Sequence, residues 1–221
     1  MLALKNVSLL RDGITVFDDI SLEIRDGEFV FLVSQTGAGK STLLRLISMD
    51  IRPTSGTVVA GGYDSTTIRA RQIPFLRRQI GLIFQDSRLL EDRNVFENVA
   101  FPLYVTGAKN SQIKERVFKA LDEVDLANKS TDMPNELSDG DQQRVAIARA
   151  LVHDPFTILA DEPSGNLDLG TAYGLLGLLR RINSRGTTVL TATHNYELVK
   201  KMPARLIQIR KGKLLEVELN V

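Results

Sequence analysis

Apolar residues follow two alternating patterns along the chain. Short continuous apolar runs occur in "GEFVFLV", "IGLIF", "FTILAD" and "TTVLTAT". Such runs are typical of strands that are buried on both faces of a parallel sheet. Between them, apolar residues recur at helical spacing, as in "KSTLLRLISM", and further helices are predicted after Leu137, from Thr171 and from Tyr196. Strands that alternate with helices predict an α/β core with a parallel sheet.

Two regions depart from this alternation. At the start, "LALKNVSL" and "TVFDDISLEI" predict neighbouring strands joined by a turn at Asp12–Gly13, and "SGTVVAGG" predicts another short strand. In the middle, residues 94–128 read as helix, with Ile113, Val117 and Leu121 on one face. We therefore expect one domain over residues 1–221, with a helical subdomain inserted at about 88–153. The closing "RLIQIRKGKLLEVEL", residues 205–219, predicts a hairpin that turns at 211–212.

Composition excludes several classes of function. The chain has 221 residues, and 28 Lys and Arg stand against 27 Asp and Glu, so its formal net charge is +1. That balance gives no general electrostatic reason to expect nucleic acid as a partner. Cysteine is absent, which excludes disulfides and thiolate zinc sites. No run approaches the roughly 18 to 20 apolar residues that cross a bilayer. We expect membrane contact only through a partner protein.

The segment "SQTGAGKST" lies between a predicted strand and a predicted helix, and it fits most of the phosphate-loop pattern G-x-x-x-x-G-K-[ST]. Backbone N–H groups late in the loop would surround phosphates, and Lys40 would reach the β- and γ-phosphates. The hydroxyl of Ser41 would bind Mg²⁺. The alternative is a tight turn that merely uses glycine. The candidate nucleotide-binding residues here are Ser34, Gln35, Thr36, Gly37, Ala38, Gly39, Lys40, Ser41 and Thr42.

Ser34 departs from this pattern, because it occupies the position of the first glycine. If that position requires a positive φ, serine would cost on the order of 1 kcal/mol of strain. We expect such a cost to weaken nucleotide binding modestly without abolishing it.

A pair of acids ends the predicted strand "FTILAD". Asp161 comes at the carboxyl end of that strand, where ligands bind in α/β sheets, and it is a candidate metal ligand. The adjacent Glu162 is a candidate for polarising an attacking water. The alternative is that the two acids cap the next helix.

The segment "ELSDGDQQRVAIARAL", Glu136 to Leu151, resembles the signature motif of ABC-transporter ATPases. Other marks of that family follow in the same order: Gln85 after "IGLIF", Asp168 at the end of "SGNLD", and His194 in "TATHN". The resemblance covers most of the chain. It implies an ABC-type P-loop ATPase with a parallel-sheet core, an N-terminal antiparallel β subdomain and an inserted helical subdomain.

The resemblance also implies cofactors and residue roles. ATP and Mg²⁺ are the expected cofactors, with Lys40, Glu162, Gln85 and His194 in catalysis and Ser41, Gln85 and Asp161 at the metal. His194 would bridge the γ-phosphate and the attacking water, although a lone histidine is often structural. A homodimer is expected to form on ATP binding. In it, the nucleotide held by one subunit would contact Ser138 and Gly140 of the other. Asp168 is a further candidate nucleotide-binding residue.

Further departures from the family pattern predict slow ATP hydrolysis. Asp139 and Asp141 stand where the signature usually has glycine and glutamine. Carboxylates near a triphosphate are unfavourable unless they point away or meet cations. The family also places an aromatic residue near Arg11 to stack on adenine, and this region has none before Phe17. Arg11 would instead lie over the base by cation–π contact.

The partner is indicated by "IPFLRRQIGLIF" and "QDSRLLEDRNVFENVAFPLYVTG". Both resemble the FtsE family of cell-division ATP-binding proteins, which pair with the transmembrane protein FtsX. The resemblance implies a peripheral protein on the cytoplasmic side of the bacterial inner membrane, in a complex that controls cell-wall hydrolases. We expect the FtsX-like partner to dock on residues 85–104, where the apolar side chains are Leu89, Leu90, Val95, Phe96 and Val99. The alternative for these side chains is that they anchor the helical insert to the core.

Two other groups of ABC ATPases are alternatives to the FtsE-like assignment. ATPases of lipoprotein-release and macrolide-export transporters share the short single-domain layout. ABC-type ATPases that act on DNA interrupt the core with a long coiled coil or with zinc modules. This chain has no heptad run and no cysteine, which argues against the DNA-acting class.

Overall fold

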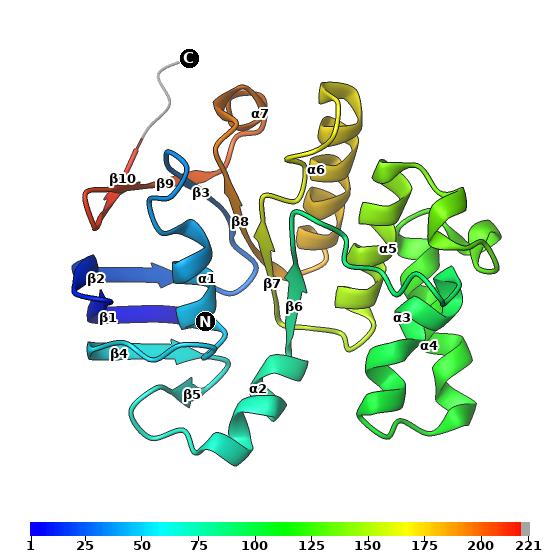
Figure 1. Ribbon diagram of the computed structural model, residues 1–221, viewed down its shortest axis with the longest axis horizontal. Coiled ribbons are helices and arrows are strands. Elements are labelled where there is room, and N and C mark those ends of the chain that lie inside the picture. The colour runs from blue at the N-terminus through cyan, green and yellow to red at the C-terminus, as the bar shows by residue number, and fades with distance from the viewer. Residues whose placement is uncertain (218–221) are drawn as a thin grey trace.

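The computed structural model of the protein describes residues 1–217 (Figure 1). The strands are β1 (Leu2–Arg11), β2 (Ile14–Ile24), β3 (Phe29–Val33), β4 (Ser55–Ala60), β5 (Tyr63–Asp64), β6 (Ile80–Ile83), β7 (Thr157–Asp161), β8 (Thr188–Thr193), β9 (Arg205–Arg210) and β10 (Lys213–Glu216). The α-helices are α1 (Lys40–Ile47), α2 (Ile73–Arg78), α3 (Val95–Val105), α4 (Asn110–Glu123), α5 (Asp139–Leu151), α6 (Leu169–Asn183) and α7 (Tyr196–Lys200). Short 3₁₀ turns are η1 (Ala70–Gln72), η2 (Ala127–Lys129) and η3 (Pro134–Glu136).

A six-stranded sheet forms the centre of the molecule, in the order β10-β9-β3-β8-β7-β6. Its strands pair in parallel from β9 through β6, and β10 joins β9 antiparallel. Every residue of β3 and β8 is buried, because helices or the second sheet cover both faces. The prediction of a parallel α/β core from the continuous apolar runs is therefore confirmed.

A four-stranded antiparallel sheet, in the order β2-β1-β4-β5, lies against one side of the central sheet (Figure 1). The β1–β2 turn places Asp12 at φ 51° and Gly13 at φ 77°, two positive values that suit a tight hairpin. One apolar core fills the space between this sheet, α1 and the central sheet. A second core lies on the opposite face, under α3, α4, α5 and α6.

The helical region is joined to the loop before it by one buried side chain. Asn98 of α3 is fully buried. Its amide oxygen accepts from the N–H of Leu90 at 2.7 Å, and its amide nitrogen donates to the carbonyls of Leu90, Arg93 and Asn94 at 3.1, 2.9 and 3.0 Å. Asn94 caps α3 by accepting from the N–H of Glu97 at 2.8 Å. Loop and helix are therefore held as one unit.

The C-terminal hairpin follows the predicted pattern over the part that the structure describes. Lys211 and Gly212 form its turn, with φ values of 49° and 73°. β10 ends at Glu216, and residues 218 and 219 of the predicted hairpin lie outside the described residues. Within residues 1–217, no helix is both long and apolar enough to span a membrane.

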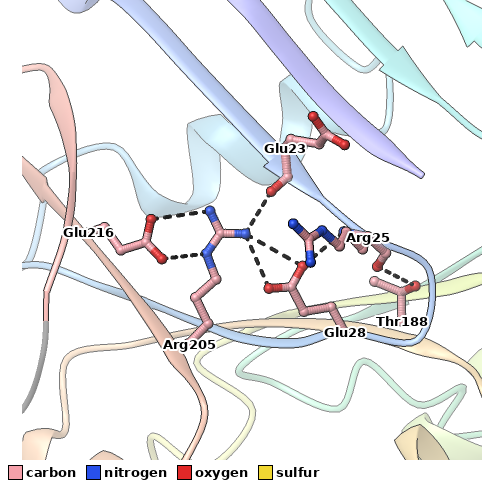
Figure 2. Close-up of polar contacts among 6 residues, drawn as sticks. All are labelled: Glu23, Arg25, Glu28, Thr188, Arg205 and Glu216. Carbon is pink, nitrogen blue, oxygen red and sulfur yellow. Dashed lines mark hydrogen bonds and ion pairs between the residues drawn. The ribbon is translucent and has the colours of Figure 1, made fainter.

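Arg205, the first residue of β9, links the two sheets. Its guanidinium donates to Glu28 at 3.1 Å and to Glu216 of β10 at 2.9 Å, from opposite sides (Figure 2). It also donates to the carbonyl of Glu23 in β2 at 2.7 Å. Glu28 in turn accepts from the N–H of Arg25 at 2.8 Å. One side chain thus ties the edge of the antiparallel sheet to β9 and β10.

We predict that Arg205→Ala lowers the free energy of unfolding by about 1–3 kcal/mol, because it leaves the partly buried carboxylate of Glu28 without its charged donor. Arg210→Ala, at the exposed end of the same strand, should change it by less than about 0.5 kcal/mol. Urea unfolding of both variants measures the difference. Equal losses in the two variants would show that the link between the sheets adds no stability.

Candidate functional site

Four parallel strands deliver the candidate residues to one edge of the central sheet. The phosphate loop follows β3, Asp161 ends β7, His194 follows β8, and Gln85 lies just after β6. Ligands of open α/β sheets bind outside the carboxyl ends of the strands. A cavity of about 520 Å³ lies at this edge. It is lined by Thr36, Gly37, Gly39, Lys40, Ser41, Thr42, Phe84, Gln85, Asp86, Arg88, Asp161, Glu162 and His194.

The phosphate loop presents the uncapped start of α1 to this cavity. Gly39 precedes the helix with φ 107°, and no side chain caps the first turn. A Cβ at Gly39 would lie 3.1 Å from the ring of Phe17, so both backbone conformation and space favour glycine. The N–H groups of an uncapped helix start can bind an anion. The loop therefore offers backbone donors where the sequence predicts phosphates.

Ser34 has a different role from the one expected from its sequence position. Its φ is not positive, so the predicted strain does not arise. Its side chain is nearly fully buried, and its hydroxyl donates to the carbonyl of Gln35 at 2.9 Å. The ammonium of Lys40 donates to the carbonyl of Ser34 at 3.1 Å and to its hydroxyl at 3.3 Å. The serine thus supplies an oxygen that a glycine would lack.

Lys40, Glu162 and His194 meet in the cavity. Glu162 Oε1 lies 3.2 Å from the Nζ of Lys40 and 2.9 Å from the Nδ1 of His194. Glu162 Oε2 also accepts from the backbone N–H of His194 at 3.2 Å. Glu162 has a φ of 50°, which is uncommon for a residue with a side chain and is a form of strain often found at functional sites. The lysine and the acid therefore form an ion pair inside the cavity.

Asp161 is adjacent to this group and has a free oxygen. Its Oδ1 is buried and has no hydrogen-bond partner within the described part of the chain. The hydroxyl of Ser41 and the amide of Gln85 line the same cavity. Carboxylate, hydroxyl and amide oxygens are the donors that Mg²⁺ prefers, and a buried carboxylate oxygen normally has a partner. The donor set therefore fits the predicted metal.

Gln85 is held by the loop after β7. Its amide donates to Asn166 at 3.1 Å, and Asn166 donates to Asp86 at 3.3 Å. A Cβ at Gly165 would lie 3.1 Å from Gln85, so the two loops touch. No local pattern predicts the contact with Asn166, because the partners are 81 residues apart.

The remaining candidates lie outside the cavity. Arg11 is exposed at the β1–β2 turn and pairs with Asp12 at 3.7 Å. Ser138 caps α5 by accepting from the N–H of Asp141 at 3.2 Å. Asp168 caps α6 by accepting from the N–H groups of Gly170 and Thr171, and the bonds from Thr171 lower the pKa of its carboxyl. This cap starts α6 at Leu169, two residues before the predicted start.

The signature segment is packed tightly against α6. A Cβ at Gly140 would lie 2.6 Å from a methyl group of Thr171, so glycine is required there. Asp141 meets a cation, because Lys129 donates to it at 2.8 Å. Partial burial acts to raise the pKa of Asp141, but the hydrogen bonds with Lys129 and Ser138 keep it below its usual value. The expected repulsion from this carboxylate is therefore offset, by a lysine that sequence analysis did not identify.

The apolar residues predicted to dock a partner are mostly part of the core. Leu89, Val95 and Val99 are 8%, 1% and 0% exposed and belong to the core under the helices. The docking role predicted for them is wrong, and the alternative of anchoring is correct. The large apolar side chains that α3 does expose are Phe101, Tyr104 and Val105.

The sequence pattern of the family described as ABC transporter matches residues 17–165. The chain belongs to the ABC transporter family. Membership makes it an ATPase of the ABC type, in agreement with the phosphate loop and the acids after β7. The predicted family and the predicted fold class are both confirmed.

Similar proteins are known in several bacteria. The cell division ATP-binding protein FtsE of Bacillus subtilis is 46% identical over 94% of this chain and 91% of its own length. The FtsE proteins of Escherichia coli and Mycobacterium tuberculosis are 46% and 47% identical, each over 91% of this chain and over 91% and 87% of their own lengths.

Solved structures of ABC cassettes share the fold. A dimeric ATP-binding cassette in a post-hydrolysis state, bound to ADP and Pi, superposes with a TM-score of 0.86 at 33% identity over the whole of both chains. CbiO1 of Clostridium perfringens, part of the ABC transporter complex CbiONQ, gives a TM-score of 0.90 at 27% identity, over 97% of this chain and 86% of its own.

We predict that Ser34→Ala raises the affinity for ATP by about two- to tenfold, because the hydroxyl competes with phosphate for the ammonium of Lys40 and a hydrogen bond contributes about 0.5–1.5 kcal/mol. Calorimetric titration with ATP measures the change. Ser48→Ala, which removes a buried hydroxyl at the far end of α1, is the control and should leave the affinity unchanged. Weaker binding by Ser34→Ala would show that the hydroxyl positions the lysine for the nucleotide.

Proposed function

We propose that this chain binds ATP with Mg²⁺ in the 520 Å³ cavity, hydrolyses it, and couples the reaction to a membrane protein in cell division. The proposal of catalysis rests on one observation: Lys40 and His194 both contact the carboxylate of Glu162, beside the unpartnered oxygen of Asp161. Phosphoryl transfer requires a cation that binds the phosphates, an acid that activates water and an acid that binds the metal.

The phosphate loop and the acids would have separate roles in binding ATP and Mg²⁺. N–H groups of the uncapped α1 start would donate to the phosphates, and Lys40 would add a fixed positive charge. Ser41, Asp161 and Gln85 would hold Mg²⁺, which neutralises charge on the phosphates when bound. Each of these groups already lines the cavity.

Glu162 would change partners when the nucleotide enters. The phosphates compete for Lys40, which now pairs with Glu162 at 3.2 Å. Released from the lysine, the carboxylate keeps its contacts with His194 and becomes free to accept a proton from water. Binding of the substrate would thus create the base that the reaction needs.

Hydrolysis would take place in a homodimer that forms on ATP binding. The start of α5 lies outside the chain's own cavity and exposes Ser138, which would contact a nucleotide held by a second subunit, while Gly140 is buried against Thr171. The related cassette that binds ADP and Pi is dimeric, which supports this arrangement. Asp139 keeps a carboxylate near that surface, and we expect turnover to be slow.

The cellular role rests on the relatives. FtsE proteins that are 41–47% identical to this chain support a role in cell division, with an FtsX-like transmembrane partner and control of cell-wall hydrolases. The chain would then lie on the cytoplasmic side of the inner membrane and reach it through that partner.

The partner would dock beside the loop that follows β6. A groove of about 560 Å³ runs between α1, α2 and this loop, and its lining includes Leu44, Arg45, Arg77, Phe84 and Arg88. The exposed side chains of α3 continue the surface beyond the loop. An intracellular helix with apolar residues and at least one carboxylate would fit a groove of this composition. Because the loop begins at Gln85, nucleotide binding would move the docking surface.

The catalytic assignment is tested by two variants. Lys40→Ala should abolish ATP binding, because it removes the cation that faces the phosphates. Glu162→Gln should retain binding, lose at least about 100-fold in ATP turnover, and accumulate as a dimer with ATP. Calorimetry, phosphate release and light scattering measure the three properties. A Glu162→Gln chain that hydrolyses ATP at the parental rate contradicts the proposed role of the acid.

The docking surface is tested by co-purification from membranes, with the bound protein identified by mass spectrometry. Val105→Glu, at a side chain that is 67% exposed on α3, should remove an FtsX-like protein from the complex while ATP binding stays intact. Leu215→Glu, at an exposed apolar side chain of β10, is the matched control and should retain it. Retention of the partner by both variants places the docking surface elsewhere.

A further inference from the structure

A run of positive charge lies just before β6. Between Asp64 and Asp86 the sequence has four arginines and no acidic residue, although the whole chain is nearly balanced at a net charge of +1. One arginine, at position 69, precedes η1, and the others lie in η1 and α2, at positions 71, 77 and 78. Figure 1 shows α2 at the lower edge of the view, at the start of β6.

One of these arginines is engaged in the fold. Arg77 donates to the carbonyls of Ser48 and Met49 at 3.2 and 3.1 Å and to the carboxylate of Asp50 at 3.2 Å. It faces the groove beside α1. Its role is therefore structural or belongs to that groove.

The other three face solvent. Arg69, Arg71 and Arg78 are exposed, and none forms an ion pair with an acid in the part of the chain that the structure describes. Phe75 lies among them and is 54% exposed, while Leu76 beside it is fully buried and anchors the helix. We call Arg69, Arg71, Phe75 and Arg78 the α2 patch.

The patch combines an aromatic ring with uncompensated charge. The guanidinium of Arg78 lies 5.1 Å from the centre of the Phe75 ring. The charge of Arg78 also acts on His153, whose pKa is lowered by burial and by the charges of Arg116 and Arg78. An exposed phenylalanine with arginines around it is the composition of surfaces that bind at a membrane interface, where the ring enters the headgroup region and the arginines meet phosphates.

We propose that the α2 patch binds the headgroups of anionic phospholipids. The charges complement a negatively charged surface, and the patch lies on the exposed side of two short helical segments. None of the cavities and grooves described above is lined by Arg69, Arg71, Phe75 or Arg78. A plane of headgroups can meet such an exposed surface, where the ring enters the interface and the arginines meet phosphates.

The expected affinity is modest. Each arginine near an anionic bilayer improves binding by roughly fivefold. Three arginines alone give a weak and salt-sensitive attachment, which is enough to orient a chain that a partner also holds. This inference departs from the expectation that membrane contact comes through a partner only, because it adds direct contact between the chain and the bilayer.

The test is co-sedimentation of the purified chain with vesicles. At low salt the chain should bind phosphatidylglycerol vesicles, bind phosphatidylcholine vesicles at least tenfold less, and dissociate in 1 M NaCl because salt screens the charges. Arg71→Glu combined with Arg78→Glu should reduce binding to phosphatidylglycerol by at least about 25-fold. Arg210→Glu combined with Lys211→Glu makes the same change in net charge at the β9–β10 turn and should retain binding. ATP affinity checks that all variants are folded.

Three outcomes would overturn the proposal. The first is equal binding of the parental chain to both kinds of vesicle. The second is an equal loss in the two charge-reversed variants, which would indicate an effect of net charge alone. The third combines two results: the parental chain fails to bind vesicles, and the Arg71→Glu, Arg78→Glu chain loses a membrane protein on co-purification. Together they would identify an acidic protein segment as the ligand. Because the vesicles contain no protein, the result does not depend on the proposed partner.

Discussion

The parallel pairing of β3, β8, β7 and β6 is the constraint on which the site depends. Val33 pairs with Thr193 and Asp161 pairs with Ala192, so adjacent strands end nearly level. Loops that follow such strands must leave the sheet at the same edge. The phosphate loop, Glu162 and His194 therefore meet although they are far apart in the sequence. The arrangement requires cover on both faces of the sheet, which the two apolar cores provide.

Part of the charge at this edge is paired within the chain itself. Lys40 has three oxygen partners, two from Ser34 and one from Glu162. Glu162 keeps its unusual backbone conformation through hydrogen bonds of its N–H to Ala192 and of its carbonyl with the N–H of Gly165, at 2.9 and 3.0 Å. The pairing of Lys40 with Glu162 reduces the cost of burying either charge. It also means that an entering anion has to replace existing bonds.

Much of the fold could be predicted from the sequence, because its signals are local. A run such as "FVFLV" is too apolar for an edge strand, and Asp12–Gly13 suits only a tight turn. The placement of the phosphate loop, Asp161, Glu162 and His194 at one edge was predictable for a similar reason, since each comes at or just after the end of a strand. The contacts that were missed join distant segments. Neither the bond between Lys40 and the Ser34 hydroxyl nor the pairing of Asp141 with Lys129 produces a periodic pattern in the sequence. A docking role was expected for the apolar residues 89, 95 and 99 because an apolar side chain at the junction of a loop and a helix gives the same sequence signal whether it faces a partner or the core.

The four backbone bonds of Asn98 have a mechanical consequence. A flexible loop would absorb a small displacement at Gln85 before it reached the helices. Here the amide of Asn98 bonds Leu90, Arg93 and Asn94, so residues 90–94 and α3 behave as a stiff lever. A displacement that reaches Leu90 is therefore passed on to the far end of α3, which carries the exposed side chains of Tyr104 and Val105.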